Sequence, residues 1–153
     1  MKKFTKYLGV TLLEVMLVLA IAAMIIVMSV RYYQTASYNQ QANSALQTIQ
    51  AVTAAADGLA QGSGDYSAVD QANIAALLPG TVGSVITMPW GGELQITGGG
   101  TTVYTVTLTA VPRVICTQLA ARFLSQPKFA NALTPVADCG DPGAFTFTYD
   151  NSK

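Results

Sequence analysis

The first part of the chain is almost uniformly apolar. Between Val10 and Val30 only Thr11, Glu14 and Ser29 are not hydrophobic, so that 18 of these 21 residues are apolar. A helix rises 1.5 Å per residue, so a helix over this stretch would be roughly 31 Å long, about the thickness of a bilayer's hydrocarbon core. The pattern therefore predicts a membrane-spanning helix.

Beyond this stretch the apolar positions become one-sided. No proline or glycine occurs from residue 10 to residue 57, so we expect the same helix to continue to a length of roughly 50 residues. Apolar residues recur at helical spacing on one face, and glutamine and asparagine occupy the rest. The apolar face consists of Ala42, Ala45, Leu46, Ile49, Val52 and Ala56. This face is expected to lie against a globular head, and Gly58, followed by the glycines of residues 62–64, is expected to end the helix.

The remaining residues predict a small mixed head. A short helix is expected over residues 70–77 and a second over 114–124, with strands over 93–97, 101–111 and 145–149. The links between the strands have hairpin length, which is too short for parallel crossovers, so the sheet should be antiparallel and the fold class α+β. The residues expected to face the core are Tyr104, Val106, Leu108 and Ala110, then Ile115, Leu119 and Phe123, and finally Phe145, Phe147 and Tyr149.

The charges that flank the apolar stretch predict its orientation. Lys2, Lys3 and Lys6 precede it, whereas Arg31 is the one basic residue near its far end. This asymmetry favours a cytoplasmic N-terminus, with the rest of the chain translocated. A cleaved secretory signal peptide is the alternative, but the apolar stretch exceeds the usual ~7–15 residues and no A-x-A-like site closes it.

Composition excludes several classes of function. Eight basic and eight acidic side chains give net charge zero, and only 10% of residues are charged, so nothing indicates a nucleic-acid partner. The chain has no histidine, which excludes histidine-based triads and histidine-ligated zinc. Residues 98–100 are three glycines that suit a hairpin turn, because a phosphate loop would need a following helix and a lysine. We therefore expect no catalytic residue and no cofactor.

Two acidic residues near the C-terminus raise the question of a metal site. Asp138 and Asp141 could reach one calcium ion together. A calcium site needs six or more oxygen ligands, so two solvated loop carboxylates are the favoured interpretation and no metal site is predicted.

The two cysteines suggest a disulfide bond. Cys116 and Cys139 are 23 positions apart in the part of the chain that is expected to be translocated. Cysteine pairs in oxidising compartments usually form disulfides, which favours a bond here over two buried free thiols.

The start of the chain resembles the class III signal of type IV pilins. A nine-residue basic leader ends at Gly9 and is followed by V-T-L-L-E-V and the apolar stretch. The resemblance implies that a prepilin peptidase cleaves between Gly9 and Val10 and that the new amine of Val10 is N-methylated. It also implies that Glu14, the fifth residue of the product, neutralises the terminal amine of a neighbouring subunit during assembly. From the residues alone, Glu14 could equally reach back to the lipid headgroups.

Two further segments refine the resemblance. Residues 89–92 (PWGG) and 111–119 (VPRVICTQL) look like the PilS-type, or type IVb, pilins. The nine-residue leader departs from that branch, whose leaders are usually longer. The family implies a type IV pilin fold, in which a long N-terminal helix packs on an antiparallel sheet and a disulfide bounds a C-terminal loop that faces outward. The expected organisation is a cleaved leader (1–9), a membrane or filament-core segment (10–30), an amphipathic segment (31–60) and a globular head (61–153).

The resemblance also implies a function. The chain would be a structural subunit, not an enzyme, that polymerises into a type IV pilus for adhesion, aggregation or conjugative contact. Its partners would be other copies of itself, the prepilin peptidase and N-methyltransferase, an assembly platform protein with its ATPase, and an outer-membrane secretin. The precursor would lie in the inner membrane with its head in the periplasm, and the assembled pilus would be extracellular. The alternatives are a minor pilin or a type II secretion pseudopilin, and, less favoured, a membrane-tethered binding domain or enzyme.

Overall fold

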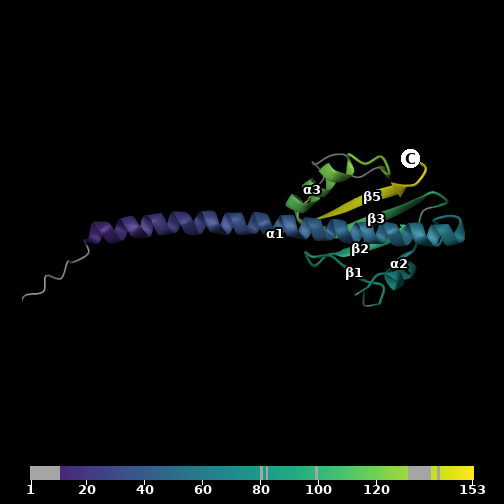
Figure 1. Ribbon diagram of the computed structural model, residues 1–153, viewed down its shortest axis with the longest axis horizontal. Coiled ribbons are helices and arrows are strands. Elements are labelled where there is room, and N and C mark those ends of the chain that lie inside the picture. The colour runs from purple at the N-terminus through teal and green to yellow at the C-terminus, as the bar shows by residue number, and fades with distance from the viewer. Residues whose placement is uncertain (1–10, 80, 82, 99, 131–138, 141) are drawn as a thin grey trace, which may run out of the picture. The chain divides into compact units, whose positions relative to one another are not determined.

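The expected long helix is present as α1 (Leu12–Ser63), 52 residues in a computed structural model of the chain (Figure 1). The structure describes residues 11–79, 81, 83–98, 100–130, 139–140 and 142–153. It divides into two compact units, Met1–Ser37 and Tyr38–Lys153, which are described separately below, and α1 contributes to both. The second unit contains the head.

The C-terminal end of α1 lies within residues 62–64, the second of the two places where the sequence predicts a stop, and not at Gly58. The helix passes through Gly58 and Gly62 and ends at Ser63. Gly64 then adopts a left-handed conformation (φ +88°), and its N–H donates to the carbonyl of Ala60 over 2.8 Å, which closes the last turn. A glycine within a helix costs only about 1 kcal/mol relative to alanine. The buried face of α1 outweighs that cost, so the expectation that Gly58 would end the helix is wrong.

The head contains a five-stranded antiparallel sheet in the order β1-β2-β3-β5-β4. Its strands are β1 (Ile86–Thr87), β2 (Glu93–Gly98), β3 (Val103–Val111), β4 (Phe129–Ala130) and β5 (Gly143–Asp150). The predicted antiparallel sheet and its three longer strands are confirmed. The edge strands β1 and β4 were not predicted, because two residues are too few to show an alternating pattern.

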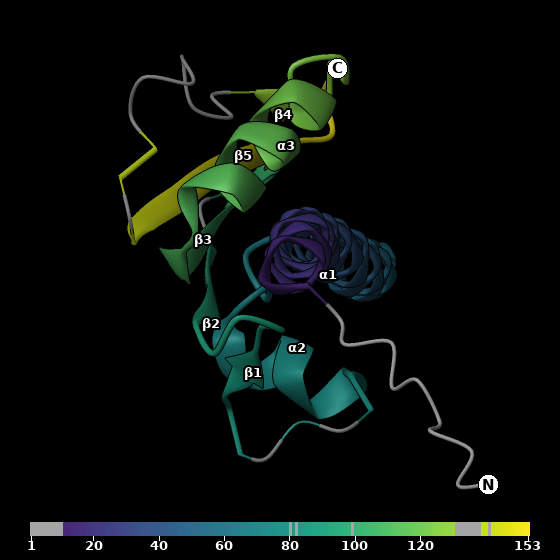
Figure 2. The same cartoon turned by 90° about the vertical axis from the view of Figure 1, so that its left-hand side faces the viewer.

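The helices of the head and one face of the sheet enclose the core (Figure 2). The short helix α2 (Gln71–Leu77) begins at the N-cap Asp70, and α3 (Arg113–Phe123) follows β3. Phe123 of α3 stacks on Phe147 of β5, with ring centroids 4.9 Å apart. Of the predicted core residues, those that are buried are Ala42, Ala45, Ile49, Val52, Ala56, Tyr104, Val106, Leu108, Ile115, Leu119, Phe123, Phe145, Phe147 and Tyr149. Leu46 packs against them and is partly buried.

One expected core residue in β3 is misplaced. Ala110 is exposed, with φ +53°, and Val111 is buried in its place. The pairing of β3 with β5 shifts register between Leu108 and Val111, which marks a β-bulge. An extra residue in one strand reverses the face to which the following side chains point, so the prediction for Ala110 is wrong.

The PWGG turn is built around this irregular part of β3. Gly91 takes φ +89°, and the N–H of Met88 donates to the carbonyl of Gly92 over 2.8 Å. The indole Nε1 of Trp90 donates to the carbonyl of Thr109 over 3.0 Å. A Cβ atom on Gly92 would overlap that same carbonyl. The motif therefore shapes a turn that lies directly against the bulged end of β3.

Candidate assembly site

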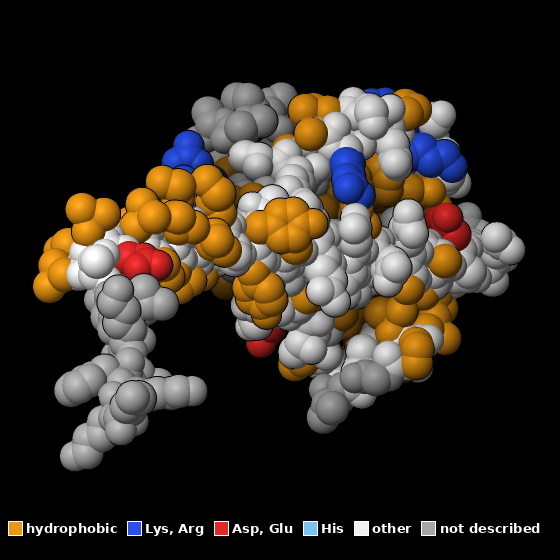
Figure 3. All heavy atoms as spheres, turned by 60° about the vertical axis from the view of Figure 1, so that its left-hand side comes forward, with side chains coloured by type: hydrophobic (Ala, Val, Ile, Leu, Met, Phe, Trp, Pro, Cys, Tyr) orange, Lys and Arg blue, Asp and Glu red, His pale blue; other side chains and the backbone are white. Residues whose placement is uncertain are grey.

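The first half of α1 carries an extensive apolar surface. Within it an 18-residue window has the length and composition of a membrane span, and none of that window is buried inside the structure. Figure 3 shows hydrophobic side chains gathered over this part of the helix. The exposed large side chains are Leu12, Leu13, Val15, Met16, Leu17, Val18, Leu19, Ile21, Met24, Ile25, Ile26, Val27, Met28 and Val30. A surface of this extent is stable only when lipid or another apolar surface covers it.

Glu14 lies in the first turn of α1. Its N–H donates to the carbonyl of Thr11 (3.0 Å) and also contacts the Thr11 hydroxyl oxygen Oγ1 (3.3 Å). Thr11 therefore acts as the N-cap and Glu14 occupies the third helical position, which is the T-x-x-E arrangement of a capping box. A carboxylate there is favoured by the helix dipole. Gly9 and Val10, the residues of the predicted cleavage site, lie outside the described residues.

The predicted disulfide between Cys116 and Cys139 is present. Cys116 lies in α3 and Cys139 precedes β5; both are buried, and their Cα atoms are 5.9 Å apart. The bond joins α3 to the chain that enters the central part of the sheet. Asp138 and Asp141, the residues of the alternative calcium interpretation, lie outside the described residues. Among the residues that are described, no group of three or more His, Cys, Asp or Glu side chains could hold a metal ion.

Two polar contacts hold α3 against the head portion of α1. The side-chain amide of Gln118 donates to Asn39 Oδ1 over 2.9 Å, and Arg122 Nη1 donates to Asn43 Oδ1 over 3.2 Å. Asn39 and Asn43 are four residues apart in α1, as are Gln118 and Arg122 in α3, so both contacts lie along one side of each helix. Asn43 lies outside the predicted apolar face of the helix, and no pattern in the sequence indicates these partners.

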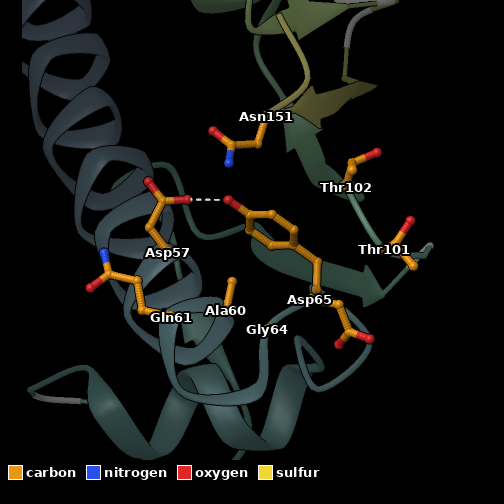
Figure 4. Close-up of a pocket in the computed structure, with 9 residues that line it drawn as sticks. Asp57, Ala60, Gln61, Gly64, Asp65, Thr101, Thr102 and Asn151 are labelled. Carbon is orange, nitrogen blue, oxygen red and sulfur yellow. Dashed lines mark hydrogen bonds between the residues drawn. The ribbon is translucent and has the colours of Figure 1, made fainter.

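A polar hollow of about 360 Å³ lies where α1 ends (Figure 4). Its wall includes Asp57, whose carboxylate accepts hydrogen bonds from the hydroxyls of Tyr66 (2.6 Å) and Tyr149 (3.4 Å). Burial of the phenol, followed by the hydrogen bond to Asp57, raises the pKa of Tyr66. At the same rim, hydrogen bonds from the side chain and the N–H of Ser67 lower the pKa of Asp65. Asp57 thus links the end of α1 to Tyr149 of β5, whereas Asp65 accepts hydrogen bonds within its own turn.

These features define a class of protein. A type IV pilin has a long helix whose apolar first half is exposed and whose second half packs on an antiparallel sheet, with a disulfide in the C-terminal part of the head, and this chain has the same architecture. The functional surface of such a protein is the surface through which it assembles.

Comparison with known proteins identifies the family. Residues 39–132 match the family model described as PilS N terminal. Over 128 residues the chain is 33% identical to the major structural subunit of bundle-forming pilus of Escherichia coli O127:H6, and equally to that of Escherichia coli O111:H-. The chain belongs to the PilS family, a family of type IVb pilins.

The alignment covers 78% of this chain and 65% of each relative, so the chain spans just under two thirds of their length. No solved structure matches the chain. The family consists of structural proteins, and the expected fold class and resemblance are confirmed.

Proposed function

We propose that this chain is the building subunit of a type IV pilus. The observation that carries the proposal is the apolar half of α1, whose membrane-span window has no buried residue, in a chain whose head encloses its own core. Such a helix is stable in the inner membrane as a monomer, and it can exchange lipid for the helices of other copies in a filament. The relatives, each a major structural subunit of a pilus, support a building role over that of a minor pilin or pseudopilin.

The proposed maturation begins with cleavage between Gly9 and Val10 and N-methylation of the Val10 amine. Glu14 of an incoming subunit would then pair with the Val10 amine of its neighbour. In an apolar filament core either charge alone would be costly, so the pair would fix the axial register of the subunits. The N-cap at Thr11 supports this role because it places Glu14 within the first turn of the helix, close to the new terminus.

The remaining expectations are part of the same proposal. Residues 1–9 form the leader, 10–30 the membrane or filament-core segment, 31–60 the amphipathic segment and 61–153 the head. The precursor would be held in the inner membrane with its head in the periplasm, and the filament would be extracellular. Processing and assembly would need the prepilin peptidase, the platform protein, its ATPase and a secretin. Adhesion, aggregation or conjugative contact are the uses that such a filament serves.

The experiment that tests the assembly role replaces Glu14. In Glu14→Val, leader removal is first established by intact mass, and the filaments sheared from the cell surface are then compared with those of the wild type. We expect processed subunit to accumulate without filaments, because each junction would hold an unpaired amine at a cost of a few kcal/mol. Ser29→Val is the matched control, since the Ser29 hydroxyl donates only to the Ile25 carbonyl of its own helix. Normal filament yield from Glu14→Val would refute the pairing.

A second measurement separates a building subunit from a minor one. A building subunit should be the most abundant protein of the sheared fraction and should begin at a methylated Val10. Gly9→Val should leave unprocessed precursor in the membrane. Assembled material that begins at Met1 or Lys2 would contradict the proposed maturation.

A further inference from the structure

The sheet of the head has a strand edge that its own strands cover only in part. The edge strand β1 pairs with β2 at Glu93 and Leu94, whereas β2 continues to Gly98. A strand edge with free N–H and C=O groups is a template for pairing with another chain. A hollow of about 350 Å³ lies along this part of β2, so an extended segment has room to approach.

The side chain of Gln71 takes the place of an added strand at this edge. The main-chain N–H of Ile96 donates to Gln71 Oε1 over 2.7 Å, and Gln71 Nε2 donates to the carbonyl of Leu94 over 2.9 Å. A side-chain amide carries the same C=O and N–H groups as a peptide unit. It therefore satisfies two of the groups of β2 that the main chain of an incoming strand would bind.

The position of Gln71 is fixed by several contacts. Its Nε2 also donates to the carbonyl of Ser84 over 2.8 Å. Gln71 is the first residue of α2, and the N-cap Asp70 accepts a hydrogen bond from the N–H of Asn73 over 2.7 Å. The Asn73 side chain donates in turn to the carbonyl of Ala68 over 3.0 Å. The start of α2 is thus held where the amide of its first residue reaches β2.

Main chain also covers one face of the last residue of β2. A Cβ atom at Gly98 would lie 2.5 Å from the carbonyl oxygen of Val69, so the segment before α2 packs directly on this glycine. Along the edge itself, β1 covers the start of β2 and the Gln71 amide covers its middle. Of these two, the Gln71 amide is the one that a single substitution removes.

We propose that Gln71 guards the β2 edge against strand addition by a second copy of this chain. Another copy presents the same row of main-chain groups, and two identical edges are self-complementary about a two-fold axis. Edge-to-edge pairing of heads would produce a closed dimer. The guard would keep the heads separate before they assemble. The inference concerns the isolated subunit, so it does not depend on whether the chain forms filaments.

The test compares Gln71→Leu with Gln95→Leu in the full chain, solubilised in a non-ionic detergent. Gln95 lies on the same strand and is exposed, so its replacement adds the same apolar side chain without removing a contact to the edge. Two quantities are measured over a range of protein concentrations: amide hydrogen exchange of the peptide that contains Ile96, and the mass of the protein in the detergent complex.

The expected result is specific to position 71. At low concentration Gln71→Leu should exchange the Ile96 amide about two- to tenfold faster than the wild type, the effect of losing one hydrogen bond. At high concentration it should form dimers in which the same amide is protected again, while Gln95→Leu stays monomeric. Faster exchange without dimers, or dimers of both variants, would overturn the proposal.

A third variant covers the case in which Gln71→Leu does not fold. Glu at position 71 keeps an acceptor for the Ile96 N–H, lacks the donor to Leu94, and adds a negative charge that repels a second identical edge. Gln71→Glu should therefore remain monomeric with a protected Ile96 amide. If it dimerises, or if that amide exchanges as fast as an unprotected one, Gln71 does not guard this edge.

Discussion

In the aromatic cluster of the head, removing a tyrosine hydroxyl should raise the free energy of unfolding at one position and lower it at another. Tyr66, Tyr104 and Tyr149 lie close together, with ring centroids 5.0 to 6.2 Å apart. Tyr104 is completely buried, and its hydroxyl has no hydrogen-bond partner among the described residues. Tyr66 is also buried, but its hydroxyl donates to Asp57. Removing each hydroxyl should therefore have a different effect on the free energy of unfolding.

The size of each effect follows from these contacts. An unsatisfied buried polar group costs about 1–3 kcal/mol, and Tyr104→Phe removes that cost while it keeps both ring contacts. The space left by one oxygen atom costs a few tenths of a kcal/mol at about 24 cal/mol per Å³. We expect Tyr104→Phe to raise the free energy of unfolding by about 1 kcal/mol. Tyr66→Phe removes a hydrogen bond to a carboxylate and should lower it by about 1.5–3 kcal/mol.

Urea unfolding of the full chain in a non-ionic detergent measures both effects. Trp90 is the single tryptophan and lies in the head, so its fluorescence reports the unfolding of that unit. The midpoint should rise for Tyr104→Phe and fall for Tyr66→Phe, with the slope unchanged in both. A midpoint for Tyr104→Phe at or below that of the wild type would refute the reasoning, because it would show that the hydroxyl contributes favourably.

Three further outcomes are expected. Gly92→Ala should destabilise the head by several kcal/mol, because the added Cβ would overlap a carbonyl of β3. Gly62→Ala should instead stabilise the protein by up to about 1 kcal/mol, because Gly62 lies within α1 and its Cβ would meet open space; urea midpoints measure both effects. Cys116→Ser should lower the free energy of unfolding by about 3 kcal/mol, because the cross-link is lost. Free-thiol labelling of the unreduced, denatured protein should then find one thiol, Cys139, whereas the wild type should show none. Between neutral pH and about pH 10 stability should be constant, and above pH 10 it should fall, because the folded state raises the pKa of Tyr66 and so binds more protons than the unfolded chain. Tyr66→Phe should make this fall shallower.

Much of the fold could be predicted from periodicity alone. The long helix and the three longer strands each contain enough residues for an apolar pattern to repeat. Their core residues were therefore assigned correctly up to the bulge at Ala110. A bulge adds one residue to one strand, and that insertion is visible only when the partner strand is known. The two-residue strands β1 and β4 could not be predicted for a related reason, because only their pairing with a neighbouring strand identifies them as strands.

The polar contacts were less predictable than the apolar ones. Asp57 accepts hydrogen bonds from tyrosines 9 and 92 positions further along the chain, and Gln71 binds β2 from 25 positions away. A polar side chain at an exposed helical position looks the same in sequence whether it meets water or a distant backbone group. The exception is Thr11, whose T-x-x-E spacing to Glu14 is a local signal that could have predicted the N-cap.

The two parts of α1 show why the sequence can predict which residues of a helix are apolar but not which surface they pack against. Its apolar first half is exposed, so its residues need only be hydrophobic, and composition is enough to recognise them. The buried face of its second half includes the small residues Ala42, Ala45 and Ala56, which are at most 1% exposed. Small side chains allow a helix to approach a sheet closely, so this face is selected for shape as well as for hydrophobicity. Periodicity identifies such a face, but the partner that it fits becomes visible only in three dimensions.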